Sequence, residues 1–348
     1  MIASFKKYEL HFKRPAGTSR GIYTNRSVWY LFLRENENGL TGIGECAPLP
    51  GLSHETPEET ELLLKKICSD PDSYVKNPDL LSRISSVRFG FETALLDLQN
   101  GGKQQLFPSA FTSGKEGIPI NGLIWMGEPA WMEQQITAKL DAGFRCIKLK
   151  IGAIGFEEEM KLLEKIRYRS CPGAVTLRVD ANGAFDQKDV MKKLNRLASL
   201  DIHSIEQPVA AGQWELMTKI CNKSPVPIAL DEELIGLNDR QEKAGLLEKI
   251  RPQYLVLKPS LHGGLAGCEE WIELAGERSI GWWVTSYLES NIALNAIAQW
   301  TFSKQVKMHQ GLGTGQLFTN NIGSPLEIRG EELWYNPSVL FDPVKPAG

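Results

Sequence analysis

The sequence predicts an α/β protein, with a (β/α)8-type barrel that follows an N-terminal α+β unit. Three observations carry this prediction. Strand-like and helix-like segments are mixed before residue 115, a strand–helix pattern repeats after it, and each repeated strand ends in a polar or charged residue. A chain of 348 residues is long enough for one large domain and one smaller domain.

The first 115 residues have the features of a compact α+β unit. Residues 27–33 are aromatic and branched apolar residues of the kind that form strands. Residues 58–68 and 86–98 carry apolar side chains at helical spacing. Glycines at 101 and 102 then mark the exit from this unit, so we expect a domain over residues 1–115.

Eight short β-rich runs follow, with successive ends about 24 to 30 residues apart, which fits one strand, one helix and two loops. They cover residues 119–121, 146–150, 175–180, 204–206, 228–231, 254–258, 282–286 and 306–310. Between two of them, Asp186 is expected to cap a helix. Eight such units favour a closed barrel over residues 116–315. An open dinucleotide-binding sheet is disfavoured, because no GxGxxG motif follows a strand.

Composition excludes several classes of partner. The net charge is −3, with 42% hydrophobic and 23% charged residues, so neither nucleic acid nor an anionic membrane is expected to bind. No apolar run has the length of a membrane span, and none follows the N-terminal lysines as in a signal peptide. The six cysteines form no CxxC pair. We therefore expect reduced thiols and a cytoplasmic location.

The charged residues at the strand ends are the main functional signal. In a barrel of this kind, the carboxyl ends of the strands surround the active site. Side chains alternate along a strand, so Lys148 and Lys150 point inward together, as do Arg178 and Asp180. Five consecutive strands place charges at this end: Lys150, Asp180, Glu206, Asp231 and Lys258. A solvated loop residue explains any one of them, but not all five in order.

This set of residues predicts magnesium-dependent proton abstraction. Burying single charges is costly unless they are paired or bind a metal, and three carboxylates make an oxygen site suited to Mg²⁺. Lysines on both sides of a metal suit removal of a proton next to a carboxylate, because the metal stabilises the enediolate that forms. A lysine near the metal and another cation is expected to have a lowered pKa, which would let it act as a base.

The ordered motifs resemble those of the enolase superfamily, in its muconate-lactonizing subgroup. The motifs are KLKIG at 148–152, VDANG at 179–183, EQP at 206–208, DEE at 231–233 and LKP at 257–259. The resemblance implies an enolase-like fold in which the N-terminal domain caps the barrel. It also implies that the loop at 44–51 closes over the substrate and that the final segment, 316–348, returns to the capping domain.

The resemblance also implies the roles of the site residues. Asp180, Glu206 and Asp231 would bind Mg²⁺, Lys150 would be the base, and Lys148 would tune it. Lys258 would stabilise the intermediate from the opposite side of the substrate. Substrate contacts or support are expected from four further residues: Arg178, Asn182, Ser286 and Glu289.

Within the subgroup, the chain looks most like the o-succinylbenzoate synthases, through residues 44–55, 258–264 and 286–290. That resemblance implies a lyase of menaquinone biosynthesis acting on a small-molecule carboxylate. Dipeptide epimerases and N-acylamino acid racemases share the catalytic set and stay open as alternatives. The epimerase alternative is weakened because residues 308–314 contain no carboxylate to hold a substrate ammonium. A non-enzymatic carboxylate-binding scaffold and a homo-oligomer also stay open.

Overall fold

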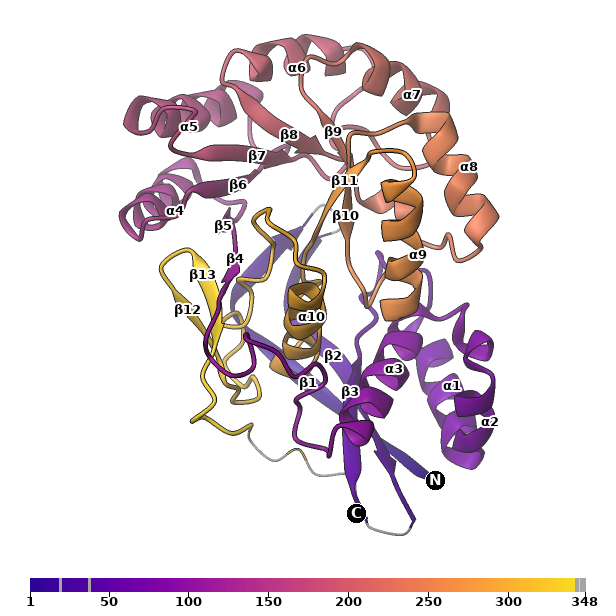
Figure 1. The fold of residues 1–348 in the computed structure, drawn as a ribbon. Helices are drawn as coiled ribbons and strands as arrows, with labels where there is room; N and C mark the ends of the chain where they lie inside the picture. Colours follow the sequence, from indigo (N-terminus) through magenta and orange to yellow (C-terminus); the bar gives the residue numbers. More distant parts are fainter. Residues whose placement is uncertain (19–20, 37–38, 342–343, 345–348) are drawn as a thin grey trace.

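The computed structural model describes residues 1–18, 21–36, 39–341 and 344. An antiparallel sheet with three helices lies beside a parallel sheet surrounded by helices, as Figure 1 shows. The enolase-like architecture predicted from the sequence is confirmed. No helix in these described ranges is long and apolar enough to cross a membrane.

The N-terminal sheet consists of β1 (Ile2–Thr18), β2 (Gly21–Arg34) and β3 (Thr41–Cys46), paired antiparallel in that order. Residues 28–33 of β2 are buried on both faces of the sheet, which explains the continuous apolar run there. Trp29, Leu31 and Leu33 join the core against the helices, whereas Val28, Tyr30 and Phe32 join a core that contains Phe318. The predicted strand at 27–33 forms the second half of a longer one.

The first helices cover one face of this sheet. They are α1 (Pro57–Ser69), α2 (Pro71–Lys76), the short 3-10 helix η1 (Pro78–Leu81) and α3 (Ser85–Gln99). Thr56 and Glu59 form a capping box that satisfies backbone N–H groups at the start of α1. Glycines permit the close approach of α3 to β3, since a Cβ atom on Gly44 would lie 1.9 Å from the Gly90 carbonyl oxygen.

Seven parallel strands form the second sheet, in the order β11-β10-β9-β8-β7-β6-β5. Their bounds are β5 (Gly122–Ile124), β6 (Cys146–Lys150), β7 (Thr176–Asp180), β8 (Ile202–Glu206), β9 (Ile228–Leu230), β10 (Tyr254–Leu257) and β11 (Gly281–Val284). Lys150 pairs with Asp180, and Asp180 pairs with Glu206. This register sets three of the predicted site residues at one level.

Two predicted strands differ from the structure. The first barrel strand is β5, three residues beyond the predicted 119–121, because Pro119 belongs to β4 (Ile118–Pro119) and pairs with β13 (Glu332–Tyr335). The predicted eighth strand at 306–310 is reduced to single bridges, from Gln310 to Ile120 and from Gly311 to Thr285. These bridges close the barrel by backbone hydrogen bonds at one level only.

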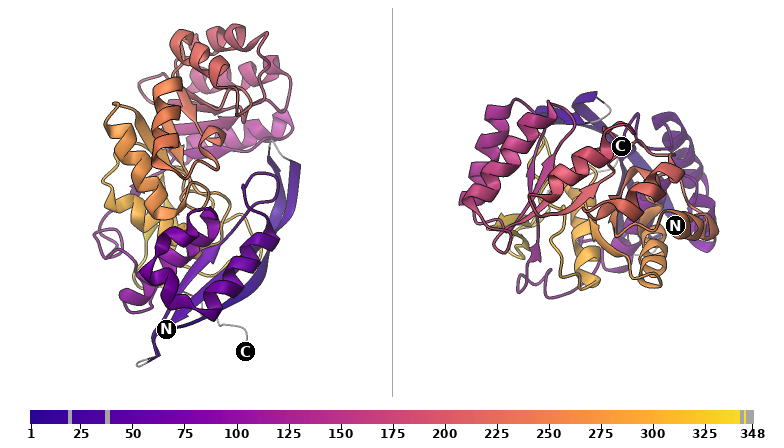
Figure 2. Two further views of the ribbon diagram at one scale, coloured as in Figure 1. Left: turned by 90° about the vertical axis from the view of Figure 1, so that its right-hand side faces the viewer. Right: turned by 90° about the horizontal axis from the view of Figure 1, so that it is seen from above.

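Helices surround the parallel strands (Figure 2). They are α4 (Pro129–Asp141), α5 (Phe156–Arg169), α6 (Val190–Ala198), α7 (Trp214–Lys223), α8 (Arg240–Ile250), α9 (Gly264–Gly276) and α10 (Asn291–Ser303). The prediction that Asp186 caps a helix is wrong. Helix α6 starts after Asp189, and the Asp186 carboxylate instead accepts a bond from the Lys188 backbone in the turn before it.

The chain after the barrel contacts the first sheet and then returns to the barrel. Phe318 forms an antiparallel β-bridge with Phe12 of β1, and the Thr319 backbone N–H donates to the His11 carbonyl oxygen over 2.8 Å. Strand β12 (Leu326–Arg329) then pairs with β13 beside β4.

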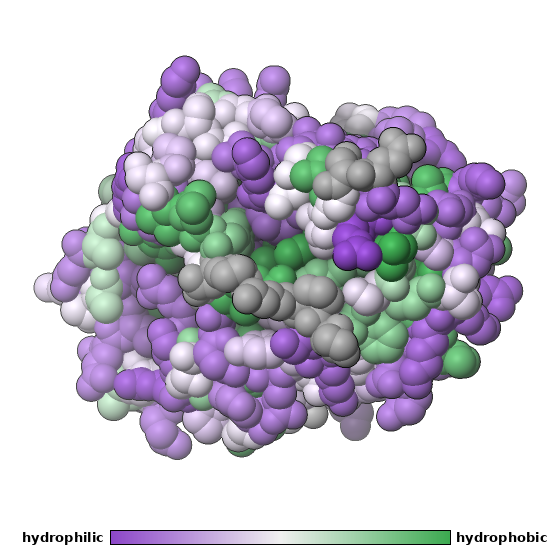
Figure 3. Space-filling model, turned by 90° about the horizontal axis from the view of Figure 1, so that it is seen from below, coloured by the Kyte–Doolittle hydropathy of each residue, from purple (hydrophilic) through white to green (hydrophobic). Residues whose placement is uncertain are grey.

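Seen from below, hydrophilic residues form much of the rim of the molecule, and hydrophobic residues gather nearer its centre (Figure 3).

Candidate active site

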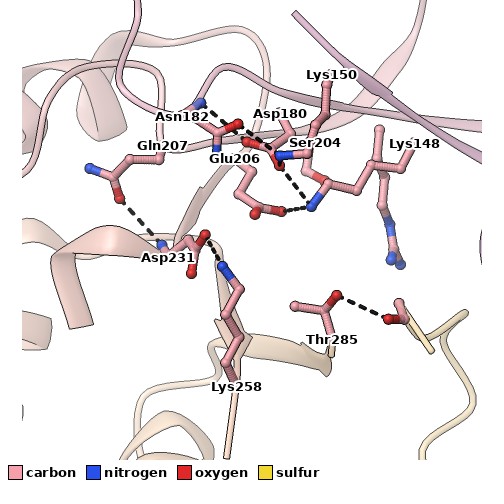
Figure 4. A network of polar contacts seen from close by, with 12 residues as sticks. Lys148, Lys150, Asp180, Asn182, Ser204, Glu206, Gln207, Asp231, Lys258 and Thr285 are labelled. Atoms are coloured by element: carbon pink, nitrogen blue, oxygen red, sulfur yellow. Dashed lines mark hydrogen bonds and ion pairs between the residues drawn. The ribbon is translucent and has the colours of Figure 1, made fainter. Parts of the chain in front are cut away.

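Three buried carboxylates lie at the carboxyl ends of neighbouring barrel strands. Asp180 ends β7, Glu206 ends β8, and Asp231 follows β9, and each is no more than 2% exposed. The alternation of side chains along each strand turns these residues inward. Figure 4 shows them facing the ammonium groups of three lysines.

The lysines approach the carboxylates from two sides. From β6, Lys148 Nζ lies 3.0 Å from Asp180 Oδ2 and 2.5 Å from Glu206 Oε2, and Lys150 Nζ lies 3.0 Å from Asp180 Oδ2. From the end of β10, Lys258 Nζ forms an ion pair with Asp231 Oδ2. The predicted pair of flanking lysines is therefore brought together with the predicted carboxylates.

The electrostatics keep two of these lysines charged. Burial favours the neutral form of Lys148, but Asp180 and Glu206 outweigh it and raise its pKa above the ordinary value. Burial likewise opposes the charge of Lys258, and Asp231 and Glu206 outweigh it, so this pKa is also raised. Lys148 and Lys258 therefore stay cations beside the carboxylates.

The carboxylates respond differently to burial. Burial, followed by the charge of Asp180, raises the pKa of Glu206 to about 8. Burial acts in the same direction on Asp180, but Lys148 and Lys150 outweigh it and hold its pKa well below the usual range. Burial, and then Asp231, raises the pKa of the neighbouring Glu232 to about 7.

The donor set fits a divalent cation in its chemistry. Within the described residues, Glu206 Oε1 and Asp231 Oδ1 are buried oxygens that accept no hydrogen bond, which is unfavourable unless a cation or water binds them. In the same part of the chain, no three acidic, histidine or cysteine side chains are already arranged so that they could hold a metal ion. Lysine ammonium groups lie between the carboxylates instead, so a cation would take over part of their contacts.

A pocket of about 340 Å³ opens above these groups. Lys148, Lys150 and Lys258 line it, and Leu49 and Leu52 reach it from the loop after β3. Its volume suits a small molecule. A larger hollow of about 820 Å³ lies beside Tyr254 and Gly281, at the opposite ends of the barrel strands and away from the charged cluster.

The four predicted substrate contacts are placed differently from one another. Asn182 and Ser286 line the pocket, and the Ser286 hydroxyl bonds to that of Thr314. Arg178 is not among the lining residues: its guanidinium lies 4.1 Å from the Trp283 ring centre and donates to the His309 carbonyl. Glu289 is also outside the lining, where it accepts bonds from Ser260 and the Tyr287 backbone.

Other residues of the pocket were not named individually from the sequence, although Leu49 belongs to the loop at 44–51 that is expected to close over the substrate. Asn121 is buried and its Oδ1 accepts no bond from the described chain, while Leu49 and Trp125 supply apolar walls. Glu232 also lines the pocket. The DEE run after β9 was a usable signal for Glu232, but nothing in the sequence gives the conformation of the loop that carries Leu49.

Comparisons with known proteins identify the family of the chain. Residues 131–333 match the enolase C-terminal domain-like family, and residues 5–98 match the MenC N-terminal domain family. The chain is 46% identical to an o-succinylbenzoate synthase of Desulfotalea psychrophila, over 95% of this chain and 98% of that protein.

Solved structures show the same similarity. The crystal structure of MenC from Desulfotalea psychrophila matches with a TM-score of 0.81 and 42% identity, over 96% of this chain and 99% of that one. A dipeptide epimerase from Enterococcus faecalis, solved with Mg and a dipeptide, has a TM-score of 0.82. It is only 20% identical over 96% of each chain, and so shows the fold alone.

Proposed function

Since the chain belongs to the o-succinylbenzoate synthase family of the enolase superfamily, we propose that it dehydrates 2-succinyl-6-hydroxy-2,4-cyclohexadiene-1-carboxylate to o-succinylbenzoate. The observation that carries this proposal is the 46% identity over almost the whole of both chains. The pocket lined by three lysines and buried carboxylates supports it.

Lys150 is the proposed base. It takes the proton from the carbon that bears the ring carboxylate, and the electrons of that C–H bond move into the carboxylate to give an enediolate. When these electrons return to the ring, the C–O bond to the hydroxyl breaks. Lys150 gives its proton to the departing oxygen, so the products are water and the aromatic o-succinylbenzoate. No further reactant is needed.

Lys258 and Lys148 have electrostatic roles in this scheme. Lys258 lines the pocket with a raised pKa, so it stays a cation beside the negative charge that develops on the substrate. Lys148 forms ion pairs with Asp180 and Glu206 and so holds these two carboxylates in place beside the pocket.

Asp180, Glu206 and Asp231 would hold Mg²⁺. The ion supplies Lewis-acid stabilisation of the substrate carboxylate when it is bound. The two unpartnered oxygens of Glu206 and Asp231 support this assignment, because they need a positive or hydrogen-bonding partner within the described site.

The proposed setting is menaquinone biosynthesis in the cytoplasm, on a small-molecule substrate. Six unpaired cysteines, four of them buried, fit a reducing compartment. We expect neither nucleic acid nor a membrane as a partner, since the net charge of −3 gives no basic surface. A homo-oligomer remains part of the proposal.

The test is a spectrophotometric assay of the purified protein with Mg²⁺ and the cyclohexadiene substrate, with EDTA as a control. Rapid aromatisation that EDTA abolishes would support the synthase reaction. A folded, metal-loaded protein that leaves this substrate unchanged would contradict it. Binding of the carboxylate without turnover would favour the non-enzymatic scaffold.

A further inference from the structure

We propose that Glu232 is a positioning residue that directs the lone pair of Lys150 toward the substrate by fixing the side-chain amide of Asn182. This inference rests on the proposed role of Lys150 as the base. It follows from a chain of hydrogen bonds that leads from Lys150 through Asn182 to Glu232.

Two acceptors hold the Lys150 amino group. Its Nζ donates to Asp180 Oδ2 over 3.0 Å and to Asn182 Oδ1 over 2.8 Å. A neutral amine has two N–H bonds and one lone pair. When both N–H bonds are used by these acceptors, the lone pair takes the remaining tetrahedral direction, and Lys150 lines the pocket. A proton taken up there becomes the N–H that faces the substrate.

The amide of Asn182 serves this purpose in one orientation only. Its oxygen must face Lys150, because its NH₂ group would donate to the lone pair and block the base. The backbone of Asn182 is held in the left-handed region at φ 44°, and its N–H donates to Asp180 Oδ1 over 3.1 Å. These contacts fix the backbone but leave the side-chain amide free to turn.

Glu232 fixes the orientation of that amide. Asn182 Nδ2 donates to Glu232 Oε1 over 3.0 Å, so the NH₂ group faces Glu232 and the amide oxygen faces Lys150. Glu232 follows Asp231 in the short 3-10 helix η2 (Glu232–Leu234) and is 7% exposed.

Asn182 and Glu232 also border open space outside the substrate pocket. Both residues line the pocket and a neighbouring cleft of about 500 Å³. Small residues form much of that cleft, among them Ala153, Gly183 and Ala210. The hydrogen bond to Glu232 holds the NH₂ group of Asn182 beside this cleft.

The adjacent Glu233 provides a matched control. It is also buried, at 5% exposed, but accepts from the Gly212 backbone and from Gln207 Nε2. Within the described chain, Glu233 makes no hydrogen bond to Lys150 or Asn182, although it is a buried glutamate of the same helix as Glu232.

The experiment compares Glu232→Leu, Glu232→Gln and Glu233→Gln with the natural protein in Mg²⁺-saturated assays. Glu232→Leu is expected to lower kcat by about 100-fold with little change in KM, as small misplacements of reacting groups do. Substrate deuterated at the reacting carbon should then show a larger isotope effect on kcat. Glu232→Gln keeps an acceptor and should recover most of the rate, and Glu233→Gln should keep the natural isotope effect.

A readout without substrate separates this inference from the synthase assignment. In protein labelled with ¹⁵N-asparagine, the side-chain NH₂ signals of Asn182 are identified by their loss in Asn182→Asp. The chemical shifts of these signals should change in Glu232→Leu but stay the same in Glu233→Gln. Unmoved signals in Glu232→Leu would overturn the inference, as would a natural kcat and isotope effect. Failure of the natural protein to turn over substrate would overturn only the synthase proposal.

Discussion

Buried carboxylates occur at the barrel mouth and in the N-terminal unit, and the two groups are satisfied in different ways. Glu45, on β3, accepts from the Ser290 backbone over 2.9 Å, the Ser290 hydroxyl over 2.5 Å and the Ala293 backbone over 3.1 Å. At the mouth, Glu206 and Asp231 each keep one buried oxygen that accepts no bond within the described residues.

We propose that this difference reflects what each group does. Donors on both oxygens hold Glu45 in a fixed position, where it links β3 to the start of α10 and so joins the two parts of the fold. The mouth carboxylates Glu206 and Asp231 each keep one oxygen without a hydrogen bond in the described chain, which is unfavourable for folding alone. The proposed metal site would use these two oxygens.

The largest expected effect comes from Lys150→Ala. Removing a general base lowers kcat by about 10² to 10⁴-fold, and the fold should persist because the Lys150 side chain lines the pocket and is partly exposed. Steady-state kinetics and a thermal melt measure the two quantities. Lys161→Ala, which removes an exposed lysine of α5, is the control. Comparable rates in the two variants would show that Lys150 is not the base.

The next effect concerns the metal. A cation that binds only the folded state adds about 2.7 kcal/mol to the free energy of unfolding at 100 times its Kd. We expect Mg²⁺ to raise the melting temperature of the natural protein, EDTA to reverse this, and Glu206→Gln to abolish the response. An equal Mg²⁺ response in Glu206→Gln would remove Glu206 from the metal site.

Glu45→Gln should lower the free energy of unfolding without changing catalysis or the Mg²⁺ response. A Gln NH₂ group would face the donors of Ser290 and Ala293, and a buried unsatisfied group costs about 1 to 3 kcal/mol. Chemical denaturation should show this loss while kcat and the Mg²⁺ response stay natural. A variant that kept its stability but lost Mg²⁺ binding would erase the distinction between the two groups of carboxylates.

The smallest effect is a pH dependence of stability. The folded pKa of Glu206 is about 8, above its ordinary 4.5, so the folded state binds this proton more tightly than the unfolded state does. The resulting stability is complete below pH 4.5 and is lost as pH rises through 8. Between pH 5.5 and 7.5, metal-free natural protein should lose up to about 1.4 kcal/mol per pH unit from this group, and Glu206→Gln should lose less. Parallel curves would contradict the assignment to Glu206.

The sequence predicted the barrel and its charged rim because both depend on local periodicity. Strands at 146–150 and 254–258 were recognised by apolar runs ending in lysine, and the structure has β6 and β10 there. The alternation of side chains along a strand predicts which side of the sheet a residue faces, but not whether it reaches the pocket. Arg178 does point inward, yet it stacks on Trp283 instead of lining the pocket.

Features set by contacts between distant segments were beyond sequence reasoning. The eighth strand was overextended because its apolar pattern does not reveal that Gln310 and Gly311 alone reach their neighbours. Glu289 was expected at the substrate, but the loop folds so that Ser260 and the Tyr287 backbone bond both of its oxygens. Asn182 was predicted from its motif, whereas its hydrogen bond to Glu232 became evident only from the geometry.

The bridge from Phe318 to Phe12 has a consequence for engineering this fold. The chain starts in the N-terminal sheet, builds the barrel, and then touches that sheet again before ending. Exchanging the N-terminal unit with that of a relative at one junction would leave β1 beside a foreign closing segment. A chimera that retains both sides of this contact needs two crossovers, one near residue 115 and one that carries residues 317–320 with β1.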